Sequence, residues 1–175
     1  MDTKHKLIAA AERVFDRHGF TATGMDRLTA EAGMSSRTLY KHAGSKTALM
    51  QAVLAERERR FMARLDVSGV DAIFVALAEW VHTEGARGCL FLRTLGETGA
   101  DLPVLADAVM AHKAAFRERV AEIVAAEVGE ETAAGLSEQI LVLIEGATAA
   151  AVYRGPDAVA AARAAAATLI DGARR

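Results

Sequence analysis

The sequence has little cysteine and little proline, and its opposite charges nearly cancel. Its one cysteine, Cys89, cannot form an internal disulfide, and no cysteine and histidine residues have the spacing of a structural zinc site. We therefore expect no disulfide scaffold, no metal site and no cofactor. Only 2 prolines interrupt the 175 residues, so few positions are closed to a helix.

Targeting signals and membrane-length apolar runs are not apparent in the sequence. The stretch from Met1 to Lys6 is polar and charged, and no apolar core of a signal peptide follows it. No uninterrupted apolar run approaches the roughly 20 residues that span a bilayer. These features predict a cytoplasmic protein with no membrane partner.

What the sequence does have is a hydrophobic content of 52%, much of it alanine. This supplies enough material for a buried core, and no segment shows the alternation of a half-buried strand. Alanine favours helices, and its small side chain lets helices approach closely. We predict an all-α fold of about nine helices.

Apolar spacing and end signals predict four helices in the first 65 residues. The expected N-cap hydroxyls of the last three are Thr23, Ser35 and Ser45. The four helices run from Thr3 to His18, from Thr23 to Gly33, between Ser35 and Gly44, and from Ser45 to about Leu65.

Longer helices are predicted beyond Asp66, and the pair Gly155 and Pro156 marks a clear break between the last two. Their approximate bounds are Val70 to Thr83, Cys89 to Thr98, Leu102 to Ala126, Thr132 to Tyr153 and Pro156 to Ala173.

The net charge of −2 hides an asymmetry along the chain. Residues 1 to 64 carry 12 Lys and Arg against 7 Asp and Glu, whereas the remainder carries 9 against 16. A basic head on an acidic body is typical of a protein that presents one end to a polyanion. Ordinary surface variation would give the same totals, so charge alone does not decide between the two.

The short helix after Ser35 combines one apolar anchor, Leu39, with a polar and basic outer face. Two helices joined by a tight turn at Gly33 allow the second to lie in a DNA major groove. Arg37 and Lys41 are four residues apart on that helix and can reach guanine edges or phosphates. Hydroxyl, phenol and imidazole groups add further contacts, and the expected DNA-binding residues of the helix and its caps are Thr23, Ser35, Ser36, Arg37, Thr38, Tyr40, Lys41, His42 and Lys46.

The stretch from Thr23 to Leu49 resembles the DNA-binding signature of the tetracycline-repressor family. The matching parts are Thr23, the Ala-x-x-Ala-Gly-like turn ending at Gly33, Thr-Leu-Tyr-x-His over residues 38–42, and Ser-Lys-x-x-Leu over residues 45–49. By this resemblance, Thr23, Thr38, His42 and Lys46 would hold phosphates. Ser36, Arg37, Tyr40 and Lys41 would face bases or flanking phosphates.

The resemblance implies a helix-turn-helix domain of three helices over residues 1–47 and a helical ligand-binding and dimerisation domain over residues 48–175. One departure is Ala43 followed by Gly44, where the family usually has a bulky apolar residue. Either Phe15, Phe20 or Met25 fills the space, or the recognition helix is held more loosely.

The family's bodies often enclose a small-molecule pocket and dimerise through the last two long helices. Candidate pocket residues are Phe61, Phe74, Trp80, Cys89, Met110, Phe116 and Tyr153. Candidate dimer residues at helical spacing are Leu136, Ile140, Leu143, Ala147, Val159, Ala162, Ala166 and Leu169. Both sets have a plain alternative, which is burial in the core of one subunit.

No nucleophile with its base, glycine-rich phosphate loop or paired carboxylates has a recognisable spacing, so an enzyme is not expected. The expected function is a homodimeric repressor that leaves a palindromic operator, a double-stranded DNA, when an unknown small-molecule effector binds. A ligand-independent architectural DNA-binding protein and an activator share the same features and remain alternatives.

Overall fold

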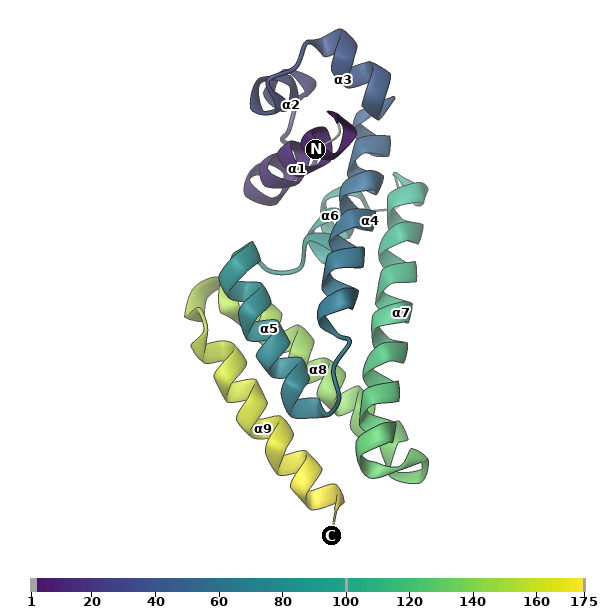
Figure 1. Ribbon diagram of the computed structural model, residues 1–175, viewed down its shortest axis with the longest axis vertical. Helices are drawn as coiled ribbons and strands as arrows, with labels where there is room; N and C mark the ends of the chain where they lie inside the picture. Colours follow the sequence, from purple (N-terminus) through teal and green to yellow (C-terminus); the bar gives the residue numbers. More distant parts are fainter. Residues whose placement is uncertain (1–2, 100, 175) are drawn as a thin grey trace. The chain divides into compact units, whose positions relative to one another are not determined.

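The computed structural model describes residues 3–99 and 101–174, and this part of the chain forms nine helices and no strand (Figure 1). The predicted all-α class is confirmed. The helices are α1 (Thr3–His18), α2 (Met25–Ala32), α3 (Ser36–Ala43), α4 (Lys46–Arg64), α5 (Val70–Glu84), α6 (Leu90–Thr98), α7 (Pro103–Val128), α8 (Glu130–Arg154) and α9 (Asp157–Ala173).

Local signals place most helix ends within two residues of the prediction. Gly19 has φ +83° and its amide donates to the Phe15 carbonyl at 2.8 Å, which ends α1. Ser35 and Ser45 cap α3 and α4 as predicted, because their hydroxyls accept from the amides of Thr38 (3.2 Å) and Ala48 (3.0 Å).

The chain divides into two compact units. Unit 1 contains residues 1–60 and 90–112, and unit 2 contains residues 61–89 and 113–175. These units differ from the domains expected from the sequence, which had their boundary after residue 47. The reason is that α6 and the first part of α7 group with the N-terminal helices. The functional boundary stays a prediction.

In unit 1, α1 packs against α2 and α3, which also contact each other. The apolar stripe of α1 is buried as its spacing predicts, through Leu7, Ala11, Val14 and Phe15. Phe15 meets Phe20 with the ring centroids 5.7 Å apart. Both rings are buried in unit 1.

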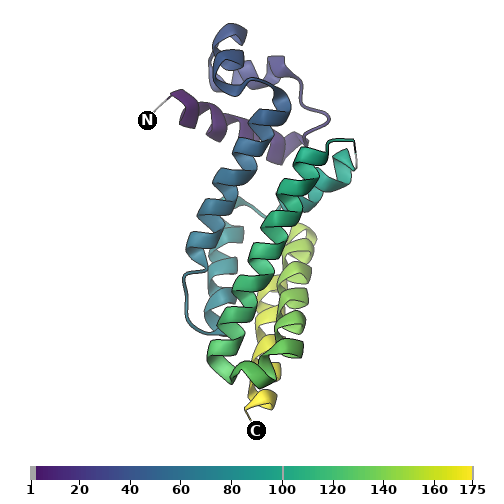
Figure 2. The same cartoon turned by 90° about the vertical axis from the view of Figure 1, so that its right-hand side faces the viewer.

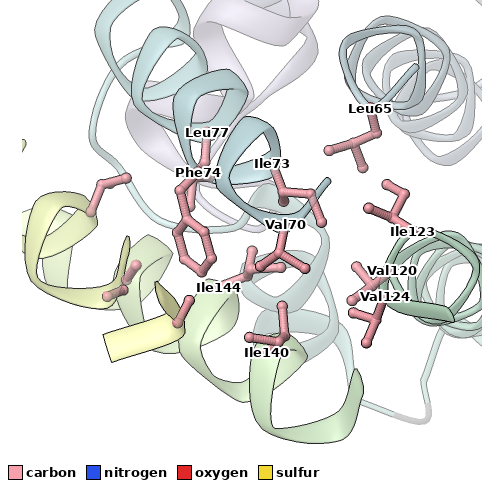
Figure 3. Packing of buried hydrophobic residues seen from close by; sticks show 14 of the residues in the cluster. Leu65, Val70, Ile73, Phe74, Leu77, Val120, Ile123, Val124, Ile140 and Ile144 are labelled. Carbon is pink, nitrogen blue, oxygen red and sulfur yellow. The ribbon is translucent and has the colours of Figure 1, made fainter. Parts of the chain in front are cut away.

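In unit 2, α9 lies along α8 and also packs on α5, and Figures 1 and 2 both show α8 and α9 side by side. Their core is a continuous apolar cluster. Figure 3 shows Phe74 and Ile73 of α5 facing Ile140 and Ile144 of α8, with Val120 and its neighbours from α7 closing one side.

Among the described helices, α8 is the one that is long and apolar enough to cross a membrane by length and composition. Two of its carboxylates form ion pairs with α7: Glu145 with Lys113 and Glu138 with Arg117, each at 2.6 Å. Core helices of soluble proteins pass the same test, and these pairs fit a helix that packs against protein.

Candidate nucleic-acid interface

Helices α2 and α3 form the predicted helix-turn-helix. Gly33 ends α2 with a left-handed φ of 61°, and the amides of Gly33 and Met34 donate to the carbonyls of Ala30 and Thr29 at 3.2 and 3.1 Å. Ser35 then caps α3 directly. The turn therefore needs only three residues, and glycine supplies the conformation that other residues adopt with difficulty.

Helix α3 buries one side chain and presents the rest. Leu39 is fully buried, while Tyr40 keeps 50% of its surface exposed. Ser35, Ser36, Arg37 and Lys41 are also exposed, and Thr38 and His42 are half-buried. No carboxylate lies on this helix. The exposed face thus combines cationic, phenolic and hydroxyl groups, which suit contacts with phosphates and base edges.

The departure at Ala43 does not leave an open turn. The Gly44 amide donates to the Tyr40 carbonyl at 2.9 Å, and Ser45 begins the cap of α4 at once. Phe15 and Phe20 are buried in this unit. That they fill the space left by the small side chain of Ala43 stays a prediction.

Thr23 differs from the prediction. Gly24 is the N-cap of α2 and makes no side-chain cap bond, while the Thr23 hydroxyl is buried and donates to the Gly19 carbonyl at 2.6 Å. The N-cap prediction for Thr23 is therefore wrong. The hydroxyl ties the turn to the end of α1, where it is not accessible to a phosphate.

Lys46 also points into the protein. Its ammonium group donates to the carbonyls of Phe20 and Thr23, each at 3.0 Å, and lies 4.4 Å from the centre of the Phe20 ring. These bonds use two of the three donors of the ammonium group and hold it against the turn. We therefore leave Thr23 out of the surface that can touch DNA in this conformation, and a phosphate contact of Lys46 stays a prediction.

Several interactions around the end of α1 and the turn that follows it were not anticipated from the sequence. Desolvation and the nearby charges of Arg27 and Arg17 lower the pKa of His18, while the charge of Glu31 acts in the opposite direction. Arg93 and Glu97 of α6 contact the same region, at Asp16 and Thr21. Because they lie more than 70 residues along the chain, no local pattern could have revealed them.

The candidate pocket residues fall into distinct environments. Phe61 contacts Trp80 and Phe116 edge to face, with centroids 5.1 and 5.4 Å apart, so three of the candidates form one aromatic cluster in unit 2. The Arg64 guanidinium lies 5.7 Å from the Trp80 ring. Phe74 is fully buried core.

The other pocket candidates are more open. Cys89 is half-buried. Met110 and Tyr153 are 61% and 80% exposed, so neither is enclosed within its own unit. Three surface hollows of unit 2 are lined by other residues, for example Arg163, Ser137 and Val75.

The candidate dimer residues lie mostly inside one subunit, which corrects their placement at an interface. Six of them are buried in the core of unit 2: Leu136, Ile140, Ala147, Val159, Ala162 and Ala166. Leu143 and Leu169 are partly buried against that core. The physical reason is that α8 and α9 pack on each other and on α5 through this stripe.

Comparisons with known proteins identify the family. Residues 7–53 match the family model described as "Bacterial regulatory proteins, tetR family". UidR, an HTH-type transcriptional regulator of Escherichia coli K12, is 26% identical over 100 residues, which are 54% of this chain and 51% of UidR. The chain therefore spans about half the length of that relative.

TtgW, an HTH-type transcriptional regulator of Pseudomonas putida, is 31% identical over 91 residues, which are 49% of this chain and 68% of TtgW. A TetR-family regulator from Streptomyces coelicolor has a solved structure that superposes with a TM-score of 0.89 at 26% identity. That superposition covers 99% of this chain and 96% of the other. The chain belongs to the TetR family of bacterial transcriptional regulators.

Proposed function

We propose that the protein is a homodimeric repressor that binds palindromic operator DNA through α3 and leaves it when a small molecule binds unit 2. The observation that carries the DNA-binding part is the face of α3, where polar and cationic side chains surround the single buried anchor Leu39. A cytoplasmic location follows from an operator as the partner.

Base reading falls to the exposed residues of α3. Arg37 and Lys41 are one helical turn apart and can reach guanine edges or phosphates, while Ser36 and Tyr40 lie beside them. Ser35, Thr38 and His42 would contact phosphates that flank the groove. Every acid of unit 1 lies on another element, so α3 itself offers no repulsion to DNA.

A dimer requires a surface that a second copy can cover, and α8 carries one beside its buried stripe. The exposed positions follow alternating steps of three and four residues: Gly135, Gln139, Val142, Gly146, Ala149 and Tyr153. Val142 is 69% exposed, and the glycines permit close helix approach. The exposed side of α9 is similarly small, with Ala161, Ala164 and Thr168.

These two stripes support a four-helix dimer seam that, on α8, is one residue away from the stripe predicted from the sequence. A symmetric dimer with its recognition helices about 34–36 Å apart would read two half-sites one turn of DNA apart.

For release by an effector, the candidate ligand site is the aromatic cluster of Phe61, Trp80 and Phe116, which has a cation, Arg64, beside it. EbrR, a multidrug binding protein with the same fold, was solved with malachite green. Helices α4 and α7 each have residues in both units, and we propose that the signal passes through α4, which leads on from the helix-turn-helix. The effector must prefer the conformer that does not bind DNA.

Activation is the second candidate, because one relative is named an activator. FasR of Mycolicibacterium smegmatis is 42% identical over 53 residues, which are 30% of this chain. Repression and activation would use the same α3 face. They differ in whether transcription from the bound promoter falls or rises when the protein is added to a purified transcription reaction.

The DNA-binding proposal is tested with palindromic fragments from the region flanking the gene, measured at several salt concentrations. Arg37→Ala should weaken binding by about 10- to 100-fold and relax specificity at one position. Arg154→Ala removes the same side chain from an exposed position of unit 2 and should change binding little. Equal effects of the two variants, or binding without sequence preference, would contradict the proposal.

The dimer seam is tested by sedimentation of charged variants. Val142→Arg should give a folded monomer, because two buried cations would face each other across a symmetric seam. Val75→Arg introduces the same charge at an exposed valine of α5 and should leave the dimer intact. Retention of the dimer by Val142→Arg would place the interface elsewhere.

A further inference from the structure

The turn between α1 and α2 is held from outside by α6. The main-chain amide of Thr21 donates to the Glu97 Oε2 at 2.8 Å. The same carboxylate lies directly against Gly19, since a Cβ at that position would be 2.7 Å from the Glu97 Oε1. The absence of a side chain at Gly19 is therefore what lets the carboxylate approach the turn.

Arg93 holds the end of α1 from one helical turn earlier on α6. Its Nη2 donates to the Asp16 carbonyl at 2.9 Å, and its Nη1 lies 3.3 Å from the Asp16 Oδ1. Asp16 is buried. Carbonyls in the last turn of a helix lack partners within the helix and carry partial negative charge, so a guanidinium stabilises them.

The turn is fixed on a second side by α4, through the Lys46 bonds to Phe20 and Thr23. Each end of the turn from Gly19 to Thr23 thus has a charged partner from a distant part of the chain. This turn sets the angle between α1 and α2, and α3 follows α2 through a turn of only three residues. Any shift of the turn would move the α3 face.

We propose that Arg93 and Glu97 are positioning residues for DNA binding: through them α6 holds the turn from Gly19 to Thr23, and so orients α2 and α3 for the operator. This inference rests on the proposed function. It adds a part of the chain far from the helix-turn-helix to the residues on which operator affinity depends, although neither side chain is required to touch DNA.

Glu97 gives the sharper test, because loss of its charge and loss of its positioning contact would change operator affinity in opposite directions. Removing a carboxylate near a DNA-binding surface strengthens attraction to a polyanion if only long-range charge matters. Removing a positioning contact weakens operator binding instead. Loss of the Arg93 charge would weaken binding by either route, so an Arg93 variant separates the two poorly.

The experiment compares three variants of the full chain: Glu97→Ala, Glu97→Gln and Asp107→Ala. The glutamine keeps an oxygen that can accept from the Thr21 amide, and Asp107→Ala removes another exposed carboxylate of unit 1. Operator affinity should fall about tenfold in Glu97→Ala, the equivalent of one lost charge-assisted hydrogen bond, and stay within about twofold in Glu97→Gln. Asp107→Ala should bind equally well or more tightly.

A second readout needs no DNA. Hydrogen exchange of the amides at residues 19–23 should be faster in Glu97→Ala and unchanged in the other two variants. Unchanged exchange in Glu97→Ala, or an affinity that follows Asp107→Ala, would overturn the inference. If the unaltered chain lacks operator binding while the exchange pattern is as expected, the proposed function fails and the contact between α6 and the turn stands.

Discussion

The ammonium group of Lys46 donates hydrogen bonds to two main-chain carbonyls that lie outside the helices. Phe20 and Thr23 lie in a turn, where carbonyl groups have no helical partner, and Lys46 reaches both at 3.0 Å while covering the Phe20 ring. At this position a cation stabilises the fold of unit 1, and its contribution is separable from any attraction to DNA.

Lys46→Met should lower the free energy of unfolding by about 1.5–3 kcal/mol, because it removes charged donors from part-buried carbonyls. Urea denaturation followed by circular dichroism measures this change. Lys41→Met is the matched control at an exposed position, and its effect should stay within about 0.5 kcal/mol.

The salt dependence of DNA binding should also distinguish Lys41 from Lys46, and here the larger effect is expected for Lys41. Lys41→Met should reduce the slope of log affinity against log salt by about 1, and Lys46→Met should leave that slope unchanged. A stable Lys46→Met protein with a reduced slope would show that Lys46 does contact phosphate.

Gly19 is the residue at which backbone conformation and a tertiary contact coincide. Gly19→Ala would force an alanine to φ +83° and push the Glu97 carboxylate from the turn, so we expect a loss of about 1–2 kcal/mol in urea denaturation. Gly96→Ala, inside α6 with open space around it, should instead gain about 0.5–1 kcal/mol. Equal effects at both positions would contradict this account.

At the residue scale, the sequence predicted side chains well where their surroundings are local. The face of α3 depends on neighbours one helical turn away, so Leu39 and the exposed residues around it could be assigned from spacing. Thr23 and Lys46 depend on which groups the folded turn leaves without partners. A motif identifies such residues but does not say which way they point.

At the scale of elements, α8 and α9 show why one apolar stripe can be mistaken for another. Leu136 and Ile140 face the core of unit 2, while Gly135 and Val142 beside them face outward. Both stripes have helical spacing and both contain small or apolar residues. Sequence spacing alone therefore predicts that two helices pack, but not which stripe packs inside the subunit.

A bidentate ion pair joins α5 and α9, and its contribution to stability should depend on pH. Arg163 donates to both carboxylate oxygens of Asp71 at 2.6 Å, and this hydrogen bonding, with the charge of Arg163, lowers the pKa of Asp71 below its usual 3.8. A folded pKa below the unfolded one gives stability that is present above the unfolded value and is lost as pH falls through the folded value.

Asp71→Asn should therefore lower the melting temperature slightly at pH 7, and the difference should shrink as the pH falls below 3.8. The effect is small because both side chains are largely exposed. Arg163→Gln should remove the same stability, so the double variant should melt like either single one. Additive losses would mean that the two residues act independently.

At the scale of the whole molecule, the chain returns to its N-terminal helices after leaving them. Residues 90–112 belong with residues 1–60, through ion pairs such as Arg93 with Asp16 and through buried apolar residues such as Phe91, Leu105 and Val109. Helix positions could be predicted because they follow from local periodicity. The packing of residues 90–112 with residues 1–60 could not be predicted, because a leucine or valine in the sequence does not indicate which distant segment it contacts.

A fragment of residues 1–60 should consequently be less stable than the same residues in the full chain. It keeps α1, α2 and α3 but loses α6, so the carbonyl at Asp16 and the amide at Thr21 lose their partners and the apolar surface beneath α6 meets water. We expect reduced helix content and a broad, weakly cooperative thermal transition by circular dichroism. Joining residues 90–112 to the fragment through a flexible Gly and Ser linker should restore a sharper transition, because those residues complete the unit. If the fragment alone unfolds as sharply as the joined form, the helix-turn-helix is self-sufficient and α6 only rests against it.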